Sequence, residues 1–449
     1  MNNTIRFFKE IAKIPRESGN EEGIANYLVE FAQERNLYCY KDKYNNVLIK
    51  KENKNLPCLI LQAHTDMVCV SENSQFNFKI KPIEVLEKDG YLYANHTTLG
   101  ADNGIGVAQI LNILDSSLPC NIEAIFTTSE ETSMTGAINF DINLLKGNYL
   151  LNLDGFDENT ILTESAAYYD LVLKSSFFKK EKSNKKYTYA IHLNGLMGGH
   201  SGYDINKKRG NAILLIAEFL KMLNGDLISI SSGTKNNVFP SQATATISTN
   251  LNNLDLSVST FFNKYQSLYP DLKINYQRIE NDSMGFSNTD KFLDFLINFP
   301  SKAINYTLNG AVTTSLNLGV IKDCYLELGL RSSRKEEALK LLKDLEEYAH
   351  KFSFELTQEG FQPGFYSDTN SNLIHILYDT CPYPNKPNIT LAHITTEVGF
   401  FQEKKPGLQV AIISPKILNA HSTQECVELH SVFLVDEWLV RFIQQFNKL

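Results

Sequence analysis

Histidine and acidic side chains follow four short segments within the first 160 residues. Because ligands in open α/β sheets bind outside the carboxyl ends of the strands, loops at these positions would bring the side chains together. Each site alone has a simpler explanation, such as a solvated loop or a helix cap, but four in succession are hard to attribute to chance. The segments and the residues that follow them are 59–63 with His64 and Asp66, 97–101 with Asp102, 122–126 with Glu130 and Glu131, and 149–153 with Asp154.

The chemistry of these side chains favours a hydrolytic metal site. Zinc in hydrolases prefers imidazole and carboxylate ligands, and a catalytic zinc keeps one position open for water. Two zinc ions about 3.5–4 Å apart need a bridging carboxylate, and a further carboxylate must stay unligated to act as a base. The pair Glu130 and Glu131 can supply a base and a ligand. In the triplet from His64 to Asp66, the carboxylate can fix the imidazole tautomer and raise its basicity.

Several segments together resemble the M20 metallopeptidases, most closely their aminoacyl-histidine (Xaa-His) dipeptidases, also called cytosol non-specific dipeptidases. The resemblance covers nearly the whole chain in order. The segments are Ile14-Pro-Arg-Glu-Ser-Gly, Leu61-Gln-Ala-His64-Thr-Asp66, Thr98-Leu-Gly-Ala-Asp102-Asn-Gly, Thr128-Ser-Glu130-Glu131, Leu151-Asn-Leu-Asp154, Gly195-Leu-Met-Gly-Gly-His200, Arg209-Gly-Asn, Asn237-Val-Phe-Pro240, Ser315-Leu-Asn-Leu-Gly319, Arg331-Ser-Ser and Ala420-His421-Ser-Thr-Gln-Glu.

This resemblance implies a site with two Zn²⁺ ions per subunit, for which Mn²⁺ or Co²⁺ could substitute. It also implies a cis peptide bond between Asp102 and Asn103. The roles that it implies are Asp102 as the bridging carboxylate, His64 and Asp154 as ligands of one ion, Glu131 and His421 as ligands of the other, Glu130 as the general base, and Asp66 as the partner of His64.

The resemblance further implies contacts to the substrate. His200 matches a histidine that reaches the oxygen of the scissile carbonyl group, often across a dimer, and Asn237 and Arg331 match positions that hold the substrate carboxyl end. An Arg suits a carboxylate because its planar group donates two hydrogen bonds. Without the resemblance, His200 would be interpreted as a turn residue and Arg331 as a surface ion pair. His393 and Glu397 complete the predicted substrate-binding set.

Four residues depart from the family pattern near the predicted substrate contacts. Thr395 replaces a Gly and Val398 replaces a Cys in the segment from His393 to Gly399. The other two are Ser241, where a basic residue is common, and Phe365, where Trp is usual. These departures bear on specificity and leave the predicted metal ligands intact.

The resemblance implies hydrolysis of dipeptides, either of the Xaa-His type or of a broader set. The alternatives on the same fold are a carboxypeptidase and an N-acyl-amino-acid deacylase. A binding protein on a catalytically dead scaffold is a third, but such a scaffold usually lacks a ligand or the base, and all seven key positions are present here. A thiol enzyme is a fourth, although the seven scattered cysteines form no Cys/His motif.

The order of expected elements predicts two domains, which the length of 449 residues also favours. Strand and helix patterns alternate at both ends of the chain, which predicts an α/β domain with a mostly parallel, mixed sheet. The middle has strands with period-two stretches and amphipathic helices, which predicts an inserted α+β domain. We therefore expect a discontinuous zinc-peptidase domain over 1–168 and 363–449, and a lid or dimerisation domain over 169–362.

Composition restricts location and partners. The net charge of -8 argues against nucleic-acid binding. No apolar run approaches the ~18–20 residues of a membrane helix, so we expect no membrane association. An odd number of widely spaced cysteines fits reduced thiols in the cytoplasm. We expect a small peptide as the substrate and, from the resemblance, a homodimer formed through the inserted domain.

Overall fold

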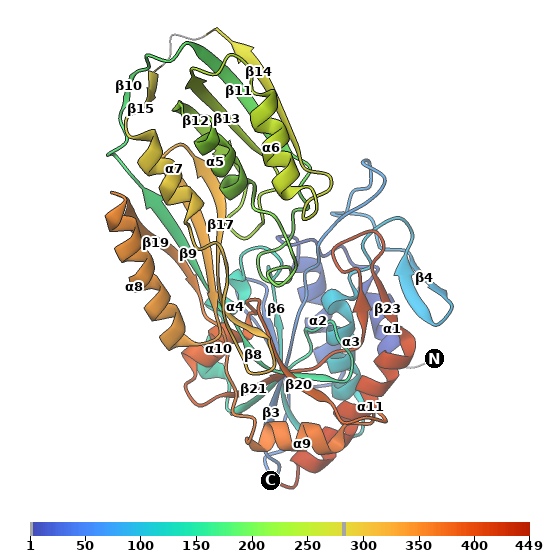
Figure 1. Cartoon of the computed structure of the whole chain (residues 1–449). Coiled ribbons are helices and arrows are strands. Elements are labelled where there is room, and N and C mark those ends of the chain that lie inside the picture. The colour runs from blue at the N-terminus through green and yellow to red at the C-terminus, as the bar shows by residue number, and fades with distance from the viewer. Residues whose placement is uncertain (1–2, 281–283) are drawn as a thin grey trace. The chain divides into compact units, whose positions relative to one another are not determined.

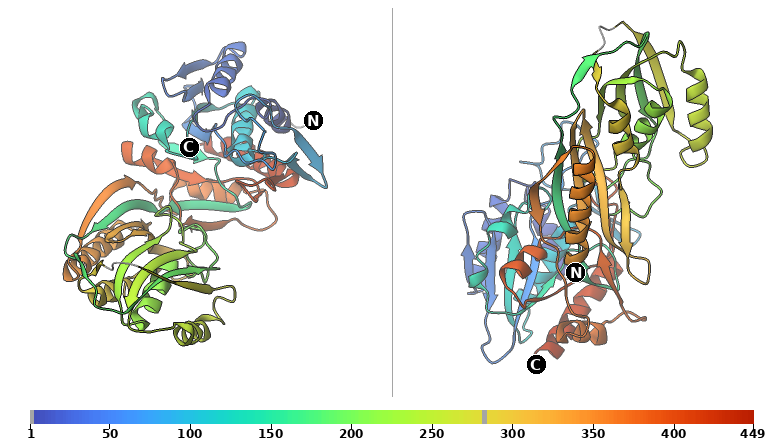
Figure 2. Two further views of the ribbon diagram at one scale, coloured as in Figure 1. Left: turned by 90° about the horizontal axis from the view of Figure 1, so that it is seen from above. Right: turned by 60° about the vertical axis from the view of Figure 1, so that its left-hand side comes forward.

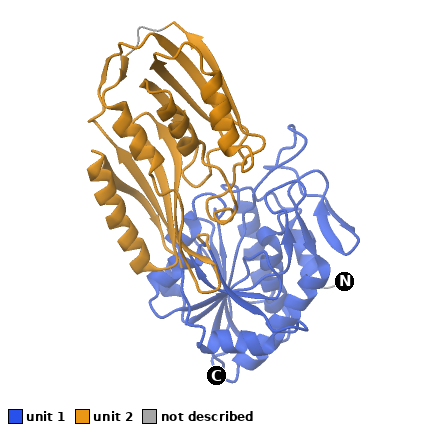
Figure 3. Cartoon of the chain, viewed as in Figure 1, with its two compact units in different colours: residues 1–165, 365–392, 396–449 blue, residues 166–364, 393–395 orange. Residues whose placement is uncertain are grey.

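The computed structural model describes residues 3–280 and 284–449, which form two compact units (Figure 3). Unit 1 consists of residues 1–165, 365–392 and 396–449, and unit 2 consists of 166–364 and 393–395. The first junction lies three residues before its predicted bound, and the second lies two residues after its predicted bound. The return of 393–395 to unit 2 was not predicted.

Unit 1 is built around an eight-stranded mixed sheet in the order β1-β2-β6-β3-β7-β21-β8-β20 (Figure 1). The four central strands β6, β3, β7 and β21 are parallel, whereas β1 and β2 are antiparallel to their neighbours. This confirms the predicted α/β class. The strands are β1 (Tyr38–Lys41), β2 (Val47–Lys51), β3 (Cys58–His64), β6 (Asn121–Thr127), β7 (Tyr149–Asn152), β8 (Thr160–Ser165), β20 (Asn388–Ala392) and β21 (Gln409–Ile412).

Successive side chains of a strand point to opposite faces of a sheet. Both faces of this sheet carry apolar side chains, and helices cover both. Leu59 and Leu61 of β3 pack into one apolar cluster, which contains residues of α1, α2, α3, α9 and α11. Ile60 packs into another, with residues of α4 and α10. The helices are α1 (Asn3–Ile11), α2 (Glu22–Glu34), α3 (Ala101–Asp115), α4 (Thr135–Asn139), α9 (Asn372–Thr380), α10 (Val398–Lys404) and α11 (Leu429–Phe446), with a 3₁₀ turn at Ile142–Leu144.

A small antiparallel sheet also belongs to unit 1. Its order is β22-β23-β5-β4, so that two hairpins far apart in the sequence pair through β23 and β5. The first hairpin precedes α3 and the second precedes α11. The strands are β4 (Val85–Lys88), β5 (Tyr91–Ala94), β22 (Ile417–Leu418) and β23 (Cys426–Glu428).

Unit 2 has an antiparallel sheet in the order β14-β11-β13-β12-β17-β18-β9-β19, with β16 beside β17. Helices pack on one face of it (Figure 2): α5 contacts β11, β12, β13 and β17, and α8 contacts β18 and β19. The strands are β9 (Ala167–Lys174), β11 (Tyr187–Asn194), β12 (Asp226–Ser232), β13 (Ala243–Thr249), β14 (Lys273–Ile279), β16 (Lys302–Tyr306), β17 (Val312–Lys322), β18 (Tyr325–Ser332) and β19 (Glu355–Gln362). The helices are α5 (Ala212–Met222), α6 (Asp255–Tyr265), α7 (Thr289–Ile297) and α8 (Lys335–Lys351), and β10 (Lys180–Lys182) pairs with β15 (Met284–Phe286) apart from the main sheet.

Helix α2 begins after Glu21 and has no side-chain cap, although Ser18 and Asn20 lie just before it and are of types that commonly cap helices. The Ser18 hydroxyl instead donates to a carboxylate oxygen of Asp66 at 2.7 Å. Ser18 therefore contacts a residue far away in the sequence and does not cap the helix.

Two findings bear on the predicted location. All seven cysteines are free, as expected for reduced thiols. Of the helices that the structure describes, none combines the length and the apolar character that a membrane span requires.

Candidate functional site

The predicted metal ligands lie in loops of unit 1 that follow central strands. His64 is the last residue of β3, Glu130 and Glu131 follow β6, and Asp154 follows β7. These strands are parallel neighbours, so their carboxyl ends meet at one edge of the sheet. Asp102 lies at the start of α3, and His421 lies in the turn between β22 and β23.

Asp102 lies between the two histidines and presents one carboxylate oxygen to each. Its Oδ1 is 3.2 Å from Nε2 of His64, and its Oδ2 is 3.0 Å from Nε2 of His421. Asp154 Oδ1 lies 3.6 Å from the same nitrogen of His64. Glu131 Oε1 lies 2.9 Å from the same nitrogen of His421. The structure thus brings together two groups of three side chains that share Asp102.

The donor set of each group fits a divalent ion. Atoms that bind one four-coordinate zinc at 2.0–2.1 Å lie roughly 3.3 Å apart, and the distances above are of this size. Oε1 of Glu131 is buried beside Nε2 of His421. Ligand atoms of His64, Glu130 and Glu131 also lie within 4.8 Å of one another. Imidazole and carboxylate around a shared Asp therefore suit a pair of zinc ions.

The pKa shifts within this cluster also favour bound cations. Burial raises the pKa values of Asp154 and Glu131, and burial together with neighbouring carboxylates raises that of Glu130 well above its usual range. Hydrogen bonds to Asp102 and Glu131 raise the pKa of His421 to about 10. Burial alone would lower the pKa of His64, but the neighbouring carboxylates, Asp154 above all, outweigh it and raise this pKa. The cluster is thus an excess of buried negative charge that bound cations would compensate.

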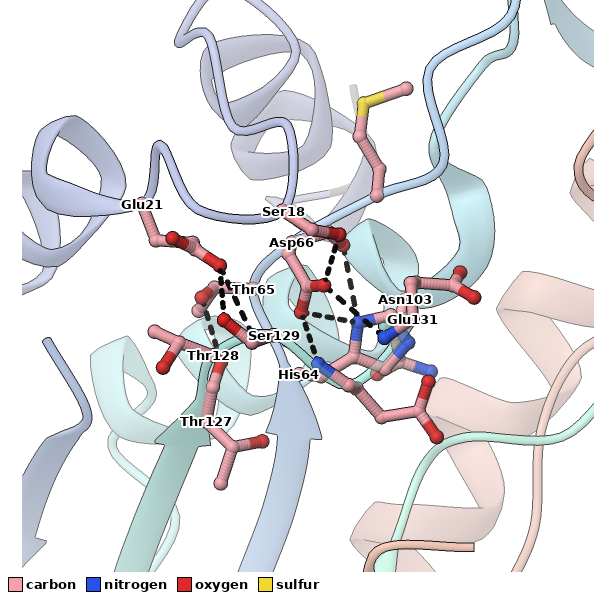
Figure 4. A network of polar contacts seen from close by, with 12 residues as sticks. Ser18, Glu21, His64, Thr65, Asp66, Asn103, Thr127, Thr128, Ser129 and Glu131 are labelled. Atoms are coloured by element: carbon pink, nitrogen blue, oxygen red, sulfur yellow. Dashed lines mark hydrogen bonds and ion pairs between the residues drawn. The ribbon is translucent and has the colours of Figure 1, made fainter. Parts of the chain in front are cut away.

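Asp66 connects His64 to the loop that carries the two glutamates (Figure 4). Its backbone carbonyl oxygen and its Oδ1 lie 3.1 and 3.4 Å from Nδ1 of His64. The Asp66 carboxylate accepts hydrogen bonds from the backbone N–H groups of Glu130 at 3.0 Å and Glu131 at 3.3 Å. Asp66 therefore contacts both His64 and the backbone of the loop that carries Glu130 and Glu131.

The loop between α1 and α2 supports the cluster through residues whose roles we did not predict. The Glu21 carboxylate accepts hydrogen bonds from the N–H and hydroxyl of Ser129, the residue before Glu130, at 3.0 and 3.2 Å (Figure 4). The fully buried guanidinium of Arg16 donates to the carbonyl groups of Thr65 and Gly100. Both lie in or beside a segment that carried the resemblance, but nothing in their spacing indicated these partners.

The start of α3 has an irregular backbone at the shared ligand. The peptide bond between Asp102 and Asn103 is cis, as expected, and neither residue has helical dihedral angles. The Asn103 side chain donates to the carbonyl of Leu153 at 2.8 Å and to Asp154 Oδ1 at 3.0 Å. Asn103 thereby holds the Asp154 ligand beside the Asp102 ligand.

Glu397, which we expected to bind substrate, lies in unit 1 with no exposed surface. Its Oε1 accepts a 2.8 Å hydrogen bond from Thr127 and a short one from Gln62. Burial raises its pKa to about 7. These contacts fit a supporting position behind the metal cluster and give no support to a substrate contact. A Gln inside the apolar segment 59–63 was the one sequence signal for this buried network.

The other predicted substrate residues form a separate cluster in unit 2. Arg331 is 4% exposed, lies over the ring of Tyr168, and donates to Thr395 Oγ1 at 3.2 Å. Its Nη2 is 3.2 Å from Nε2 of His200. Among the described residues, no acidic side chain forms an ion pair with Arg331, and its Nε has no hydrogen-bond partner. Arg331 is therefore a buried cation whose donors are not matched by a negative charge.

His393 and Asn237 also belong to unit 2. Nε2 of His393 lies 2.7 Å from the Ser315 hydroxyl, and its Nδ1 is buried without a partner. Burial and the Arg331 charge lower the pKa of His393 to about 3 and that of His200 to about 4. Oδ1 of Asn237 is buried and likewise lacks a partner. Several polar atoms of unit 2 are thus free for a ligand.

Two of the four departures are packing residues rather than neighbours of a substrate. Val398 and Phe365 are buried in the apolar cluster that covers one face of the unit 1 sheet. Thr395 contacts Arg331, as described above. Ser241 lines a hollow of about 820 Å³ in unit 2 together with Lys235 and His192.

Comparisons with known proteins agree over almost the whole chain. The model of peptidase family M20/M25/M40 matches residues 60–445. The cytosol non-specific dipeptidase of Escherichia coli (strain K12) is 30% identical, with 95% of this chain and 93% of that protein aligned. The crystal structure of aminoacylhistidine dipeptidase from Vibrio alginolyticus has a TM-score of 0.82 at 29% identity, covering 99% of this chain and 96% of that one. A tripeptidase from Staphylococcus aureus shares the fold, with a TM-score of 0.60 at 16% identity over 100% and 98% of the two chains.

Proposed function

Because this chain belongs to peptidase family M20/M25/M40, we propose that it is a two-zinc dipeptidase, acting on Xaa-His or a broader set of dipeptides. The observation that carries the proposal is the Asp102 carboxylate, which presents one oxygen to His64 and the other to His421. The names of the two dipeptidases that align over nearly the full chain support the substrate class.

The chain offers six residues for the metal pair and its base. His64, Asp102 and Asp154 would hold one ion, and Asp102, Glu131 and His421 the other. When bound, the two ions lower the pKa of a shared water toward ~7 and polarise the peptide carbonyl group. Mn²⁺ or Co²⁺ would fit the same donors.

Glu130 is the candidate general base. Its carboxylate lies within the same cluster as His64 and Glu131, and its backbone is held by Asp66. A raised pKa suits a carboxylate that must gain and lose a proton near neutral pH. Glu130 would take a proton from the attacking water and return it to the leaving amine nitrogen.

The unit 2 cluster would bind a negatively charged part of the substrate. Backbone N–H groups of Gly202 and Tyr203 point at Nδ1 of His200, at 3.2 and 3.3 Å, so this nitrogen accepts. A neutral imidazole then carries its proton on Nε2, which faces the guanidinium of Arg331, itself only a donor. A carboxylate or oxyanion between the two groups would accept from both. This contact supports the substrate-binding role of His200 and Arg331, beside Asn237 and His393.

The proposal also includes location and assembly. The free cysteines and the name of the Escherichia coli relative, a cytosol dipeptidase, support a cytoplasmic enzyme. A homodimer through residues 169–362, acting as lid and dimerisation domain, is expected from the resemblance. Size-exclusion chromatography with light scattering tests for the homodimer, and a monomer at micromolar concentration would contradict it.

The test is a panel of free dipeptides, β-alanyl-histidine and N-acetylated amino acids, each with Zn²⁺, Mn²⁺ or Co²⁺. We expect cleavage of free dipeptides only. Cleavage of the acetylated compounds alone would indicate a deacylase, release of C-terminal residues from longer peptides would indicate a carboxypeptidase, and no cleavage would favour a binding protein.

A matched variant tests the base. Glu130→Gln keeps the size of the side chain but cannot take a proton, so turnover should fall by at least about 1,000-fold. Two zinc ions per chain should remain bound, which elemental analysis measures. Residual activity within tenfold of wild type would exclude Glu130 as the base.

A further inference from the structure

His421 lies in an exposed turn whose internal hydrogen bonds do not reach Asp102, although Thr423 in the same turn donates to Glu72 at 3.3 Å. The turn joins the short strands β22 and β23, and the His421 side chain is 45% exposed. The Ser422 hydroxyl donates to the Asn419 carbonyl at 2.7 Å, and the Gln424 N–H donates to the Ser422 hydroxyl at 3.2 Å. These bonds shape the turn, but they do not fix its position relative to Asp102.

Glu425, at the end of this turn, reaches the loop before Asp102. Its carboxylate is 2% exposed and accepts from four consecutive backbone N–H groups. Oε2 accepts from Leu99 at 2.8 Å and Gly100 at 3.0 Å. Oε1 accepts from Ala101 at 2.7 Å and Asp102 at 3.3 Å.

These four N–H groups lie at the beginning of α3, where a helix has no acceptors of its own. A carboxylate there makes charge-assisted hydrogen bonds, which are about twice as strong as neutral ones. From the other side, Arg16 donates to the Gly100 carbonyl at 2.5 Å. The segment 99–102 is thus held between a buried anion and a buried cation that come from opposite ends of the chain.

We propose that Glu425 is a positioning residue that fixes the His421 turn against the backbone of Asp102, and thereby sets the second metal site. The proposal rests on the metal centre of the proposed function. Glu425 lies four positions after His421, so the same short turn carries both the ligand and its anchor. Without the anchor, the distance of 3.0 Å between His421 Nε2 and Asp102 Oδ2 would no longer be fixed.

The other metal site has supports of its own, which makes the proposal specific. His64 ends the central strand β3 and is held by Asp66. Asp154 is held by the Asn103 side chain. Loss of the Glu425 contacts should therefore weaken the site of Glu131 and His421 far more than the site of His64 and Asp154. A general loss of stability would weaken both.

The test is Glu425→Gln in the full-length protein. A Gln retains one acceptor oxygen but turns an NH₂ group toward two N–H donors, whichever way it is oriented. The control is Glu428→Gln in β23, because the Glu428 carboxylate is paired with Tyr91 and Lys416 and lies outside the metal cluster. Both variants and the wild type, stripped of metal, are titrated with Zn²⁺ against a competing chelator to obtain two stepwise dissociation constants.

We expect one of the two stepwise dissociation constants to rise about tenfold or more in Glu425→Gln, since two hydrogen bonds to a charged acceptor are lost. The other constant should change by less than about threefold, and Glu428→Gln should match the wild type. Unchanged constants, or an equal loss at both sites, would overturn the proposal.

A second measurement covers the case in which Glu425→Gln does not fold. In the metal-free wild type, the N–H groups of residues 99–102 should be protected from hydrogen exchange, and Glu425→Asp, which keeps both oxygens, should retain part of this protection. Rapid exchange at these four groups in the wild type would overturn the proposal. Failure of the wild type to cleave dipeptides would instead contradict the proposed function, while the zinc titration would still test Glu425.

Discussion

Replacement of Arg331 by Met should make the protein more stable and much less active. Arg331 is a buried cation, and no acidic side chain among the described residues forms an ion pair with it. A group that forms part of the fold usually stabilises it, whereas a group kept for binding often costs stability. If Arg331 is a structural residue, its replacement by Met should lower the free energy of unfolding. If it is a binding residue, the same replacement should raise it.

The magnitude follows from the environment of the guanidinium. Burial lowers the pKa of Arg331 from 12.5 to about 10. This difference corresponds to roughly 3 kcal/mol against the charged form. The stacking on Tyr168 and the hydrogen bond to Thr395 each return about 1 kcal/mol. Met fills a similar volume, so Arg331→Met should raise the free energy of unfolding by about 1 kcal/mol and the melting temperature by about 2–4 °C.

The assay combines thermal unfolding with kinetics on a dipeptide and on the corresponding dipeptide amide. For the dipeptide, kcat/KM should fall by about 100-fold or more because a charged partner of the substrate carboxylate is removed. For the amide, which has no such carboxylate, kcat/KM should change little. The control is Arg278→Met, since Arg278 also lies over a tyrosine ring of unit 2 but is exposed. It should leave both quantities unchanged.

The reasoning fails if Arg331→Met lowers the melting temperature by several degrees and reduces cleavage of both substrates equally. Arg331 would then be a structural residue whose charge is compensated within the fold. An increase in stability without any change in kcat/KM would also exclude the binding role.

Two further predictions concern groups that are already described. Asp66→Asn removes the charge that holds His64 and the base loop, so zinc affinity should fall about 10–100-fold in a chelator competition, and an unchanged affinity would contradict this role. His200 and His393 have folded-state pKa values of about 4 and about 3, below the unfolded value of 6.5. The unfolded chain therefore binds protons first, so the stability that these groups contribute is complete above pH 6.5 and is lost as the pH falls toward 4. The melting temperature should drop less between pH 7 and pH 5 in His393→Asn than in the wild type, and equal slopes would refute the assignment.

The parts of the fold that the sequence predicted are those with a local signal. The apolar segment 122–126 lies within β6, and residues 149–152 of the segment 149–153 form β7. Parallel strands place their carboxyl ends at one edge, which is why the loops with His64, Glu130 and Asp154 could be grouped before any coordinates were known. Only the resemblance joined His421 to them, because its turn is 319 residues from Asp102.

The parts that were not predicted depend on contacts without a local signal. Strand β17 (Val312–Lys322) has buried Thr, Ser and Asn side chains, so it shows no alternation of apolar and polar residues. Arg16 and Glu425 look like ordinary surface charges in the sequence, yet both are buried because distant backbone groups satisfy them. The carbonyl groups that accept from Arg16 are 49 to 84 residues away, and the N–H groups that donate to Glu425 are 323 to 326 residues away. Such partners are fixed only once the whole fold has formed.

The four residues that depart from the family pattern have different surroundings in the fold. Val398 and Phe365 fill an apolar cluster, so their side chains contribute to packing. Thr395 differs, because its hydroxyl accepts a hydrogen bond from Nη1 of Arg331, where the Gly of the family pattern would leave that donor free. The guanidinium then keeps Nη2, beside His200, and the unpartnered Nε for a ligand. Because two donors on one edge of the group set the angle at which a carboxylate is held, a change in preferred dipeptide relative to other family members should trace to Thr395.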